Sequence, residues 1–128
     1  MALNKRNESI QDYLETIYEL SLTIHVVRSI DIAQAMNYSK PSISIAMKKI
    51  KEKGYIIINE KGHITLTDEG YKIAKSVYEK HQVLAEMLML LGVDKETAYQ
   101  DACRIEHDLS EESFIAIKKH YEKEKNSR

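Results

Sequence analysis

The segment from Asp101 to Ser110 carries three side chains of the kinds that bind metal ions. If the segment is helical, Cys103, Glu106 and His107 lie at positions i, i+3 and i+4, so a thiol, a carboxylate and an imidazole share one face. A transition-metal ion needs deprotonated sulfur, oxygen and nitrogen donors close to one point. The spacing therefore predicts part of a metal site.

The remaining ligands are expected from two other helices. His81 lies beside the apolar stripe of a long predicted helix, and Asp12 and Glu15 are one turn apart on the first helix. Taken alone, each residue has a simpler explanation: a lone cysteine or histidine commonly belongs to the core, and acids commonly lie on the surface. Together they predict a cage of three carboxylates, two imidazoles and one thiolate, which suits one first-row divalent ion or a carboxylate-bridged pair.

The composition is typical of a folded globular chain. The 128 residues are 43% hydrophobic and 30% charged, a balance that does not fit a disordered protein. No apolar run approaches the ~20 residues that span a bilayer, and the N-terminus lacks the apolar stretch of a secretory signal. The single cysteine cannot form an internal disulfide, so a cytoplasmic location is expected.

Charge is distributed unevenly along the chain. Between Tyr38 and Lys61 there are six lysines and only two acids, whereas acidic residues gather from Asp94 onward. The formal net charge of −1 hides this difference. The distribution predicts that only the front half of the chain meets a polyanion.

Apolar periodicity and turn signals predict six helices and one hairpin. The helices are expected at residues 8–22, 29–36, 39–53, 67–91, 94–108 and from 110 onward, and the strands at 55–59 and 63–67. The tail at 122–128 is expected to fray. This order predicts a mainly α fold with a small β-wing: a winged helix-turn-helix at 1–70, followed by a helical metal-binding and dimerisation domain at 71–128.

In a winged helix-turn-helix the second helix of the turn enters the major groove of DNA, with its N-terminal residues at the base edges. Here that helix begins with short serines, and its later lysines lie where such a helix passes phosphates. The lysines alone would equally describe a solvated face. The predicted DNA-binding residues are Arg28, Ser39, Lys40, Pro41, Ser42, Ser44, Lys48 and Lys49.

Six short motifs resemble those of the DtxR/MntR family of metal-dependent transcriptional repressors. They are Asp12-Tyr-Leu-Glu15, Asp31-Ile-Ala33, Ser39-Lys-Pro-Ser-Ile-Ser44, Leu66-Thr-Asp-Glu-Gly70, Lys80-His81 and Ile105-Glu-His107. The resemblance is closest to the short, MntR-like branch. It implies a homodimer that binds a palindromic operator in double-stranded DNA when loaded with Mn²⁺ or Fe²⁺, and that represses metal-homeostasis genes. The metal ligands it implies are Asp12, Glu15, His81, Cys103, Glu106 and His107.

The resemblance is incomplete at three positions. Cys103 stands where the manganese branch usually has Glu, and in this it resembles the iron branch. A thiolate favours Fe²⁺, Co²⁺ or Zn²⁺, whereas three carboxylates favour Mn²⁺. We therefore expect a sensor of Mn²⁺ or Fe²⁺ that also binds Zn²⁺ or Co²⁺ in vitro. The ancillary site of the iron branch would need an acid and a histidine where this chain has Ala85 and Tyr99, so that site is not expected.

The expected mechanism is an ion that joins the first helix to the rear helices and so sets the separation of two recognition helices in a dimer. Two alternatives stay open on sequence grounds. One is a metal-independent winged-helix regulator with Cys103 as a redox sensor. The other is a small metallohydrolase, which the lack of a Gly-rich loop and of an evident nucleophile disfavours. The protein is accordingly not expected to be an enzyme.

Overall fold

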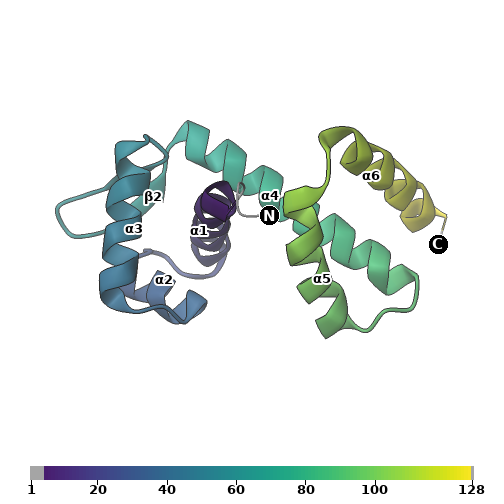
Figure 1. Ribbon diagram of the computed structural model, residues 1–128, viewed down its shortest axis with the longest axis horizontal. Coiled ribbons are helices and arrows are strands. Elements are labelled where there is room, and N and C mark those ends of the chain that lie inside the picture. The colour runs from purple at the N-terminus through teal and green to yellow at the C-terminus, as the bar shows by residue number, and fades with distance from the viewer. Residues whose placement is uncertain (1–4, 128) are drawn as a thin grey trace. The chain divides into compact units, whose positions relative to one another are not determined.

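The computed structural model describes residues 5–127, with side chains from residue 10 onward (Figure 1). The chain forms two compact units, Met1–Ser76 and Val77–Arg128. The predicted fold class is confirmed, because the elements are six helices and one two-stranded antiparallel sheet within the described residues. No helix in that part of the chain has the length and apolar character required to cross a membrane.

The first unit is a helix-turn-helix followed by a β-wing (Figure 1). Its elements are α1 (Lys5–Thr23), α2 (Ser29–Met36), α3 (Lys40–Glu52), β1 (Ile56–Ile58), β2 (Ile64–Leu66) and the start of α4 (Asp68–Leu90). The bounds of α2 are those predicted, and each strand is one residue shorter at both ends. The hydrophobic periodicity therefore located every element of this unit.

A tight turn joins α2 to α3. Asn37 ends α2 in the left-handed conformation, with φ 58° and ψ 44°, which asparagine tolerates better than most residues. Ser39 then caps α3, because its side chain accepts a hydrogen bond from the backbone N–H of Ser42. Pro41 lies in the first turn of α3, where a backbone N–H would have no carbonyl of the helix to bond, so the N–H that proline lacks is not needed. These local signals fix where the second helix of the turn begins.

The wing is a short antiparallel hairpin. Ile56 pairs with Leu66, and Ile58 pairs with Ile64. The carboxamide oxygen of Asn59 accepts hydrogen bonds from the backbone N–H groups of residues 61 and 63, each at 2.9 Å, which closes the loop. The loop is therefore held by its own side chain as well as by the strand ladder.

One apolar core holds the first unit together. Its largest fully buried side chains come from α1, α2 and α3, and they are Leu14, Ile17, Ile32, Ile43, Met47 and Ile50. The three α3 members of this set, Ile43, Met47 and Ile50, recur at helical spacing along one face and are at most 2% exposed. This packing sets which side of α3 faces outward.

Gly70 allows α4 to start directly against the wing. A Cβ atom at this position would lie 2.0 Å from the backbone oxygen of Tyr55, closer than any real contact. Thr67 reinforces the junction, because its hydroxyl donates to the carbonyl of Gly54 at 2.7 Å and accepts from the N–H of Gly70 at 3.1 Å. Thr67 therefore caps the start of α4, and only glycine fits at residue 70.

The second unit contains the rest of α4 together with α5 (Lys95–Asp108) and α6 (Glu111–Asn126), as Figure 1 shows. Asp94 caps α5 through the N–H of Thr97, and Ser110 caps α6 through the N–H of Ser113. Small residues line one packing contact, where Ala85, Ala98 and Ala102 are fully buried. A second cluster is built around Val83, Phe114 and Tyr121.

Two expectations for this unit are wrong. The tail does not fray from residue 122, because α6 continues to Asn126. Its anchor is Tyr121, which is 7% exposed and donates a hydrogen bond to Glu86 on α4. The helix expected to run to residue 91 ends at Leu90, and Leu91 is 74% exposed.

Candidate metal centre and nucleic-acid interface

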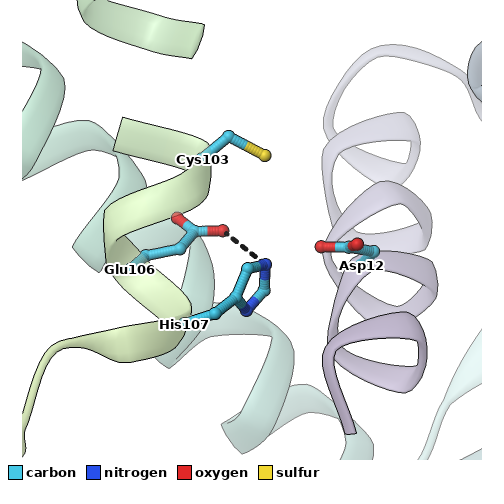
Figure 2. A group of neighbouring side chains, drawn as sticks. All are labelled: Asp12, Cys103, Glu106 and His107. Atoms are coloured by element: carbon cyan, nitrogen blue, oxygen red, sulfur yellow. Dashed lines mark ion pairs between the residues drawn. The ribbon is translucent and has the colours of Figure 1, made fainter. Parts of the chain in front are cut away.

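Three metal-binding side chains lie together on α5, as the spacing predicted. One ligand atom from each of Cys103, Glu106 and His107 lies within 4.8 Å of the others. Figure 2 labels these three side chains on α5, and Asp12 on α1. The i, i+3, i+4 pattern brings them together because those positions follow one face of a helix.

Glu106 lies between two imidazoles. Its Oε1 is 3.6 Å from Nε2 of His107, and its Oε2 is 3.7 Å from Nδ1 of His81 on α4. The Glu106 side chain is 1% exposed, and a carboxylate in such a position needs a cationic partner or strong donors. The three groups therefore form a buried cluster of one carboxylate and two imidazoles, which are donor types that suit a divalent cation.

His81 is positioned by aromatic packing. The ring of Tyr99 on α5 lies 5.5 Å from the His81 ring, centroid to centroid, at 51°. The Tyr99 hydroxyl donates to Oε1 of Gln82 at 3.0 Å, which fixes the orientation of the phenol. In the sequence, Tyr99 was notable only because it stands where the iron branch has an ancillary ligand. In the structure, Tyr99 packs against His81, a predicted metal ligand.

Asp12 and Glu15 lie one turn apart on α1, in the first unit. Glu15 is 6% exposed, and Asp12 is half-buried. The Thr16 hydroxyl donates to the backbone oxygen of Asp12 at 2.8 Å. The two carboxylates thus share a face, as the i, i+3 spacing predicted, and neither is an ordinary exposed surface acid.

The donor set fits a first-row divalent metal. In the second unit the Glu106 carboxylate lies with the Cys103 thiol and the His107 imidazole in one group, and the His81 imidazole approaches its other oxygen. Hard oxygen, intermediate nitrogen and soft sulfur donors together suit Fe²⁺, Mn²⁺, Co²⁺ or Zn²⁺ rather than Ca²⁺ or Mg²⁺. The positions of the iron-branch ancillary site hold a fully buried Ala85 and the Tyr99 described above, so no acid or histidine stands there.

The predicted DNA-binding residues are all exposed. They are Arg28 before α2, Ser39 at the cap of α3, and Lys40, Pro41, Ser42, Ser44, Lys48 and Lys49 on α3. The lysines leave the outward face of α3 strongly basic. This arrangement suits contact with phosphates along the groove.

Arg28 has a second contact that sequence reasoning missed. Its guanidinium lies 3.0 Å from Nε2 of His63, the residue before β2. Its backbone N–H also donates to the Asp31 carboxylate at 2.8 Å, as part of the α2 cap. No local sequence signal joins residues 35 positions apart, so only the fold reveals that Arg28 ties the helix-turn-helix to the wing.

Two family models match almost the whole of this chain. The model described as iron dependent repressor, N-terminal DNA binding domain, matches residues 6–64, and the model described as iron dependent repressor, metal binding and dimerisation domain, matches residues 67–126. The protein named transcriptional regulator MntR from Salmonella typhimurium is 34% identical over 112 residues, which are 88% of this chain and 71% of that protein. The chain belongs to the iron dependent repressor family. The predicted family is thereby confirmed.

One further relative and two solved structures agree with this assignment. The HTH-type transcriptional regulator MntR of Bacillus subtilis is 35% identical over 85% of this chain and 77% of that protein. The crystal structure of the metal-dependent transcriptional regulator MtsR superposes with a TM-score of 0.81 at 27% identity, over 88% of this chain and 53% of that one. The structure of the manganese regulator SloR superposes with a TM-score of 0.76 at 28% identity, over 87% of this chain and 52% of that one. The chain therefore spans about half the length of the solved structures that it matches.

Proposed function

We propose that this chain is a metal-dependent, DNA-binding transcriptional repressor that controls manganese and iron homeostasis genes. The observation that carries the proposal is the buried Glu106 carboxylate between the imidazoles of His81 and His107, in a chain whose other unit is a winged helix-turn-helix. Membership of the iron dependent repressor family supports both halves of this statement. Acting on DNA, such a regulator works in the cytoplasm and is not an enzyme.

The proposed metal ligands are the four side chains of the second unit together with Asp12 and Glu15 of α1. A divalent cation supplies positive charge that three carboxylates can share. His81 and His107 contribute neutral nitrogens, and Cys103 contributes a sulfur that must lose its proton when it ligates. The spacing of Asp12 and Glu15 on one helical face, together with their family motif, supports adding them to the set.

The proposed metal is Mn²⁺ or Fe²⁺, and Zn²⁺ or Co²⁺ are expected to bind in vitro. Solved relatives include the manganese regulator SloR and ScaR with bound Zn²⁺. Raw affinity follows the Irving–Williams order, so a site with a thiolate binds Zn²⁺ well whatever its physiological metal. The Cys103 thiolate raises the affinity of the site for Fe²⁺ relative to Mn²⁺, whereas the carboxylates favour Mn²⁺.

The proposed partner is a palindromic operator in double-stranded DNA, bound by a homodimer. A two-fold dimer presents two copies of α3, and a palindrome matches that symmetry. The second unit matches the family's metal binding and dimerisation domain. We propose domain limits of 1–70 and 71–128, which lie close to the division between the two family models.

The proposed mechanism is that ligation restrains α1, and with it the DNA-binding unit, against the metal-binding unit. In this proposal Asp12 and Glu15 approach Glu106 only when a cation neutralises their charge, so the apo protein samples more arrangements. An operator affinity raised 100-fold by metal needs about 2.7 kcal/mol of coupling. A multidentate site can supply that amount, because structural metal sites bind with about 10 kcal/mol or more.

The test is operator binding with and without metal. Fluorescence anisotropy of a labelled duplex should show at least about 100-fold tighter binding with Mn²⁺ or Fe²⁺ than with a chelator. His81→Ala should lose this response, whereas His120→Ala, at an exposed histidine of α6, should keep it. Equal affinities in the two conditions would refute metal dependence.

The family assignment gives no support to a metal-independent redox sensor built on Cys103.

A further inference from the structure

α3 carries one large apolar side chain that the core does not use. Ile45 is 59% exposed, whereas Ile43, Met47 and Ile50 on the same helix are at most 2% exposed. At 100° per residue, Ile45 is about 200° from Ile43 around the helix axis. It therefore lies opposite the buried stripe, at the middle of the outward face.

The neighbours of Ile45 on that face are the predicted DNA contacts. Pro41 and Ser42 lie one turn before it, and Lys48 and Lys49 lie one turn after it, all exposed. A single exposed isoleucine is common on protein surfaces. Here, however, Ile45 lies at the centre of a basic helix face. Because a basic face attracts polyanions, we expect the molecule that contacts Ile45 to be DNA.

The polar side chains near Ile45 are partly engaged elsewhere. The Ser39 hydroxyl donates to the Ser42 hydroxyl at 2.9 Å and accepts from the Ser42 N–H at 3.3 Å, so both belong to the helix cap. Ile45 has no donor or acceptor to offer a base edge. In the major groove, the base-edge group that an aliphatic side chain contacts favourably is the 5-methyl of thymine.

We propose that Ile45 reads thymine through apolar contact with its 5-methyl group, and so helps determine the operator sequence. The inference rests on the proposed DNA-binding function and specifies which base chemistry α3 prefers. Ser44 and the lysines contribute hydrogen bonds and phosphate contacts, while Ile45 discriminates thymine from cytosine and uracil by shape and by removal of apolar surface from water.

The experiment starts with selection of duplexes from a random pool by the full-length protein in the presence of Mn²⁺. Each thymine in the selected half-site is then replaced by deoxyuridine, which removes only the methyl group, and affinity is measured by fluorescence anisotropy. For the wild-type protein at least one such replacement should weaken binding about fourfold, the value of one buried methyl. Ile45→Ala should bind with equal affinity the two duplexes that carry thymine or deoxyuridine at that position.

Two variants serve as controls. Ile45→Val keeps an apolar side chain and should retain most of the thymine preference. Leu22→Ala removes an aliphatic side chain of α1 that is 58% exposed and should leave the preference unchanged. Selection of a defined duplex whose affinity is unaffected by deoxyuridine would overturn the role of Ile45 while leaving the proposed function intact. Failure to select any duplex would overturn both.

Discussion

Nδ1 of His81 on α4 lies 3.7 Å from Oε2 of Glu106 on α5, which joins two helices through groups far apart in the sequence. The carboxylate is almost completely buried, and His107 approaches its other oxygen. Such a carboxylate orients the imidazole beside each of its oxygens and supplies the negative charge that favours a cation.

Glu106→Gln should weaken Mn²⁺ binding by at least about 100-fold, because the isosteric amide keeps the shape but removes the charge and one anionic ligand. Isothermal titration of the purified protein with Mn²⁺ measures this directly. Glu112→Gln, at an exposed position in the first turn of α6, is the matched control. Unchanged Mn²⁺ affinity in Glu106→Gln would remove this residue from the ligand set.

Cys103→Glu should shift the metal preference of the site from Zn²⁺ and Co²⁺ toward Mn²⁺. Replacing a soft thiolate by a hard carboxylate should lower the affinity for Zn²⁺ and Co²⁺ relative to Mn²⁺ by about tenfold or more. Competition against a metallochromic indicator gives the affinity for each metal, and Cys103→Ser controls for loss of the thiol alone. An unaltered ranking of metals would mean that the Cys103 sulfur does not ligate.

Lys48→Ala and Lys49→Ala should each reduce the salt dependence of DNA binding. If each lysine neutralises one phosphate, the slope of log K against log salt should fall by about one for each variant. Anisotropy titrations between 50 and 200 mM salt, about the range over which counterion release is commonly measured, give the slope. Lys119→Ala on α6 should leave it unchanged.

Gly70→Ala should destabilise the first unit by more than about 2 kcal/mol, because its Cβ would meet the Tyr55 backbone oxygen, which cannot yield as a flexible side chain would. Urea denaturation followed by circular dichroism measures the loss. Lys72→Ala, on an exposed turn of the same helix, should change stability by less than about 0.5 kcal/mol. Equal stability of the two variants would show that the junction between α4 and the wing relaxes freely.

Tyr121→Phe should reveal a pH-dependent contribution to stability. The hydrogen bond to Glu86, then burial and the Glu86 charge, raise the pKa of Tyr121 to about 12 from the ordinary 10. Because the folded state favours the neutral phenol, this contribution is complete below pH ~10 and is lost as pH rises toward ~12. The difference in unfolding free energy between wild type and Tyr121→Phe should therefore be constant near neutrality and shrink above pH ~10.

Tyr71→Phe is the control for that measurement, since Tyr71 is 44% exposed. The other tyrosines and the lysines titrate in both proteins, so their effects cancel in the difference. A difference between wild type and Tyr121→Phe that grows with pH would contradict the proposed role of the hydrogen bond to Glu86.

The sequence by itself determined the elements and much of the candidate site. Helix caps such as Ser39, Asp94 and Ser110 act within three residues, so local pattern suffices to place them. The grouping of Cys103, Glu106 and His107 likewise follows from helical geometry alone. The family followed from the motifs because metal-binding and DNA-reading residues recur together.

Only the tertiary structure decided which groups are buried and which distant groups meet. Burial depends on neighbours far along the chain, so no local pattern could show that the charged side chain of Glu106 is enclosed. The same holds for the contact of Arg28 with His63 and for the hydrogen bond from Tyr121 to Glu86, near the end of α6 that was expected to fray. Local chemistry fixes each helix, whereas packing of one helix on another fixes what each side chain can do.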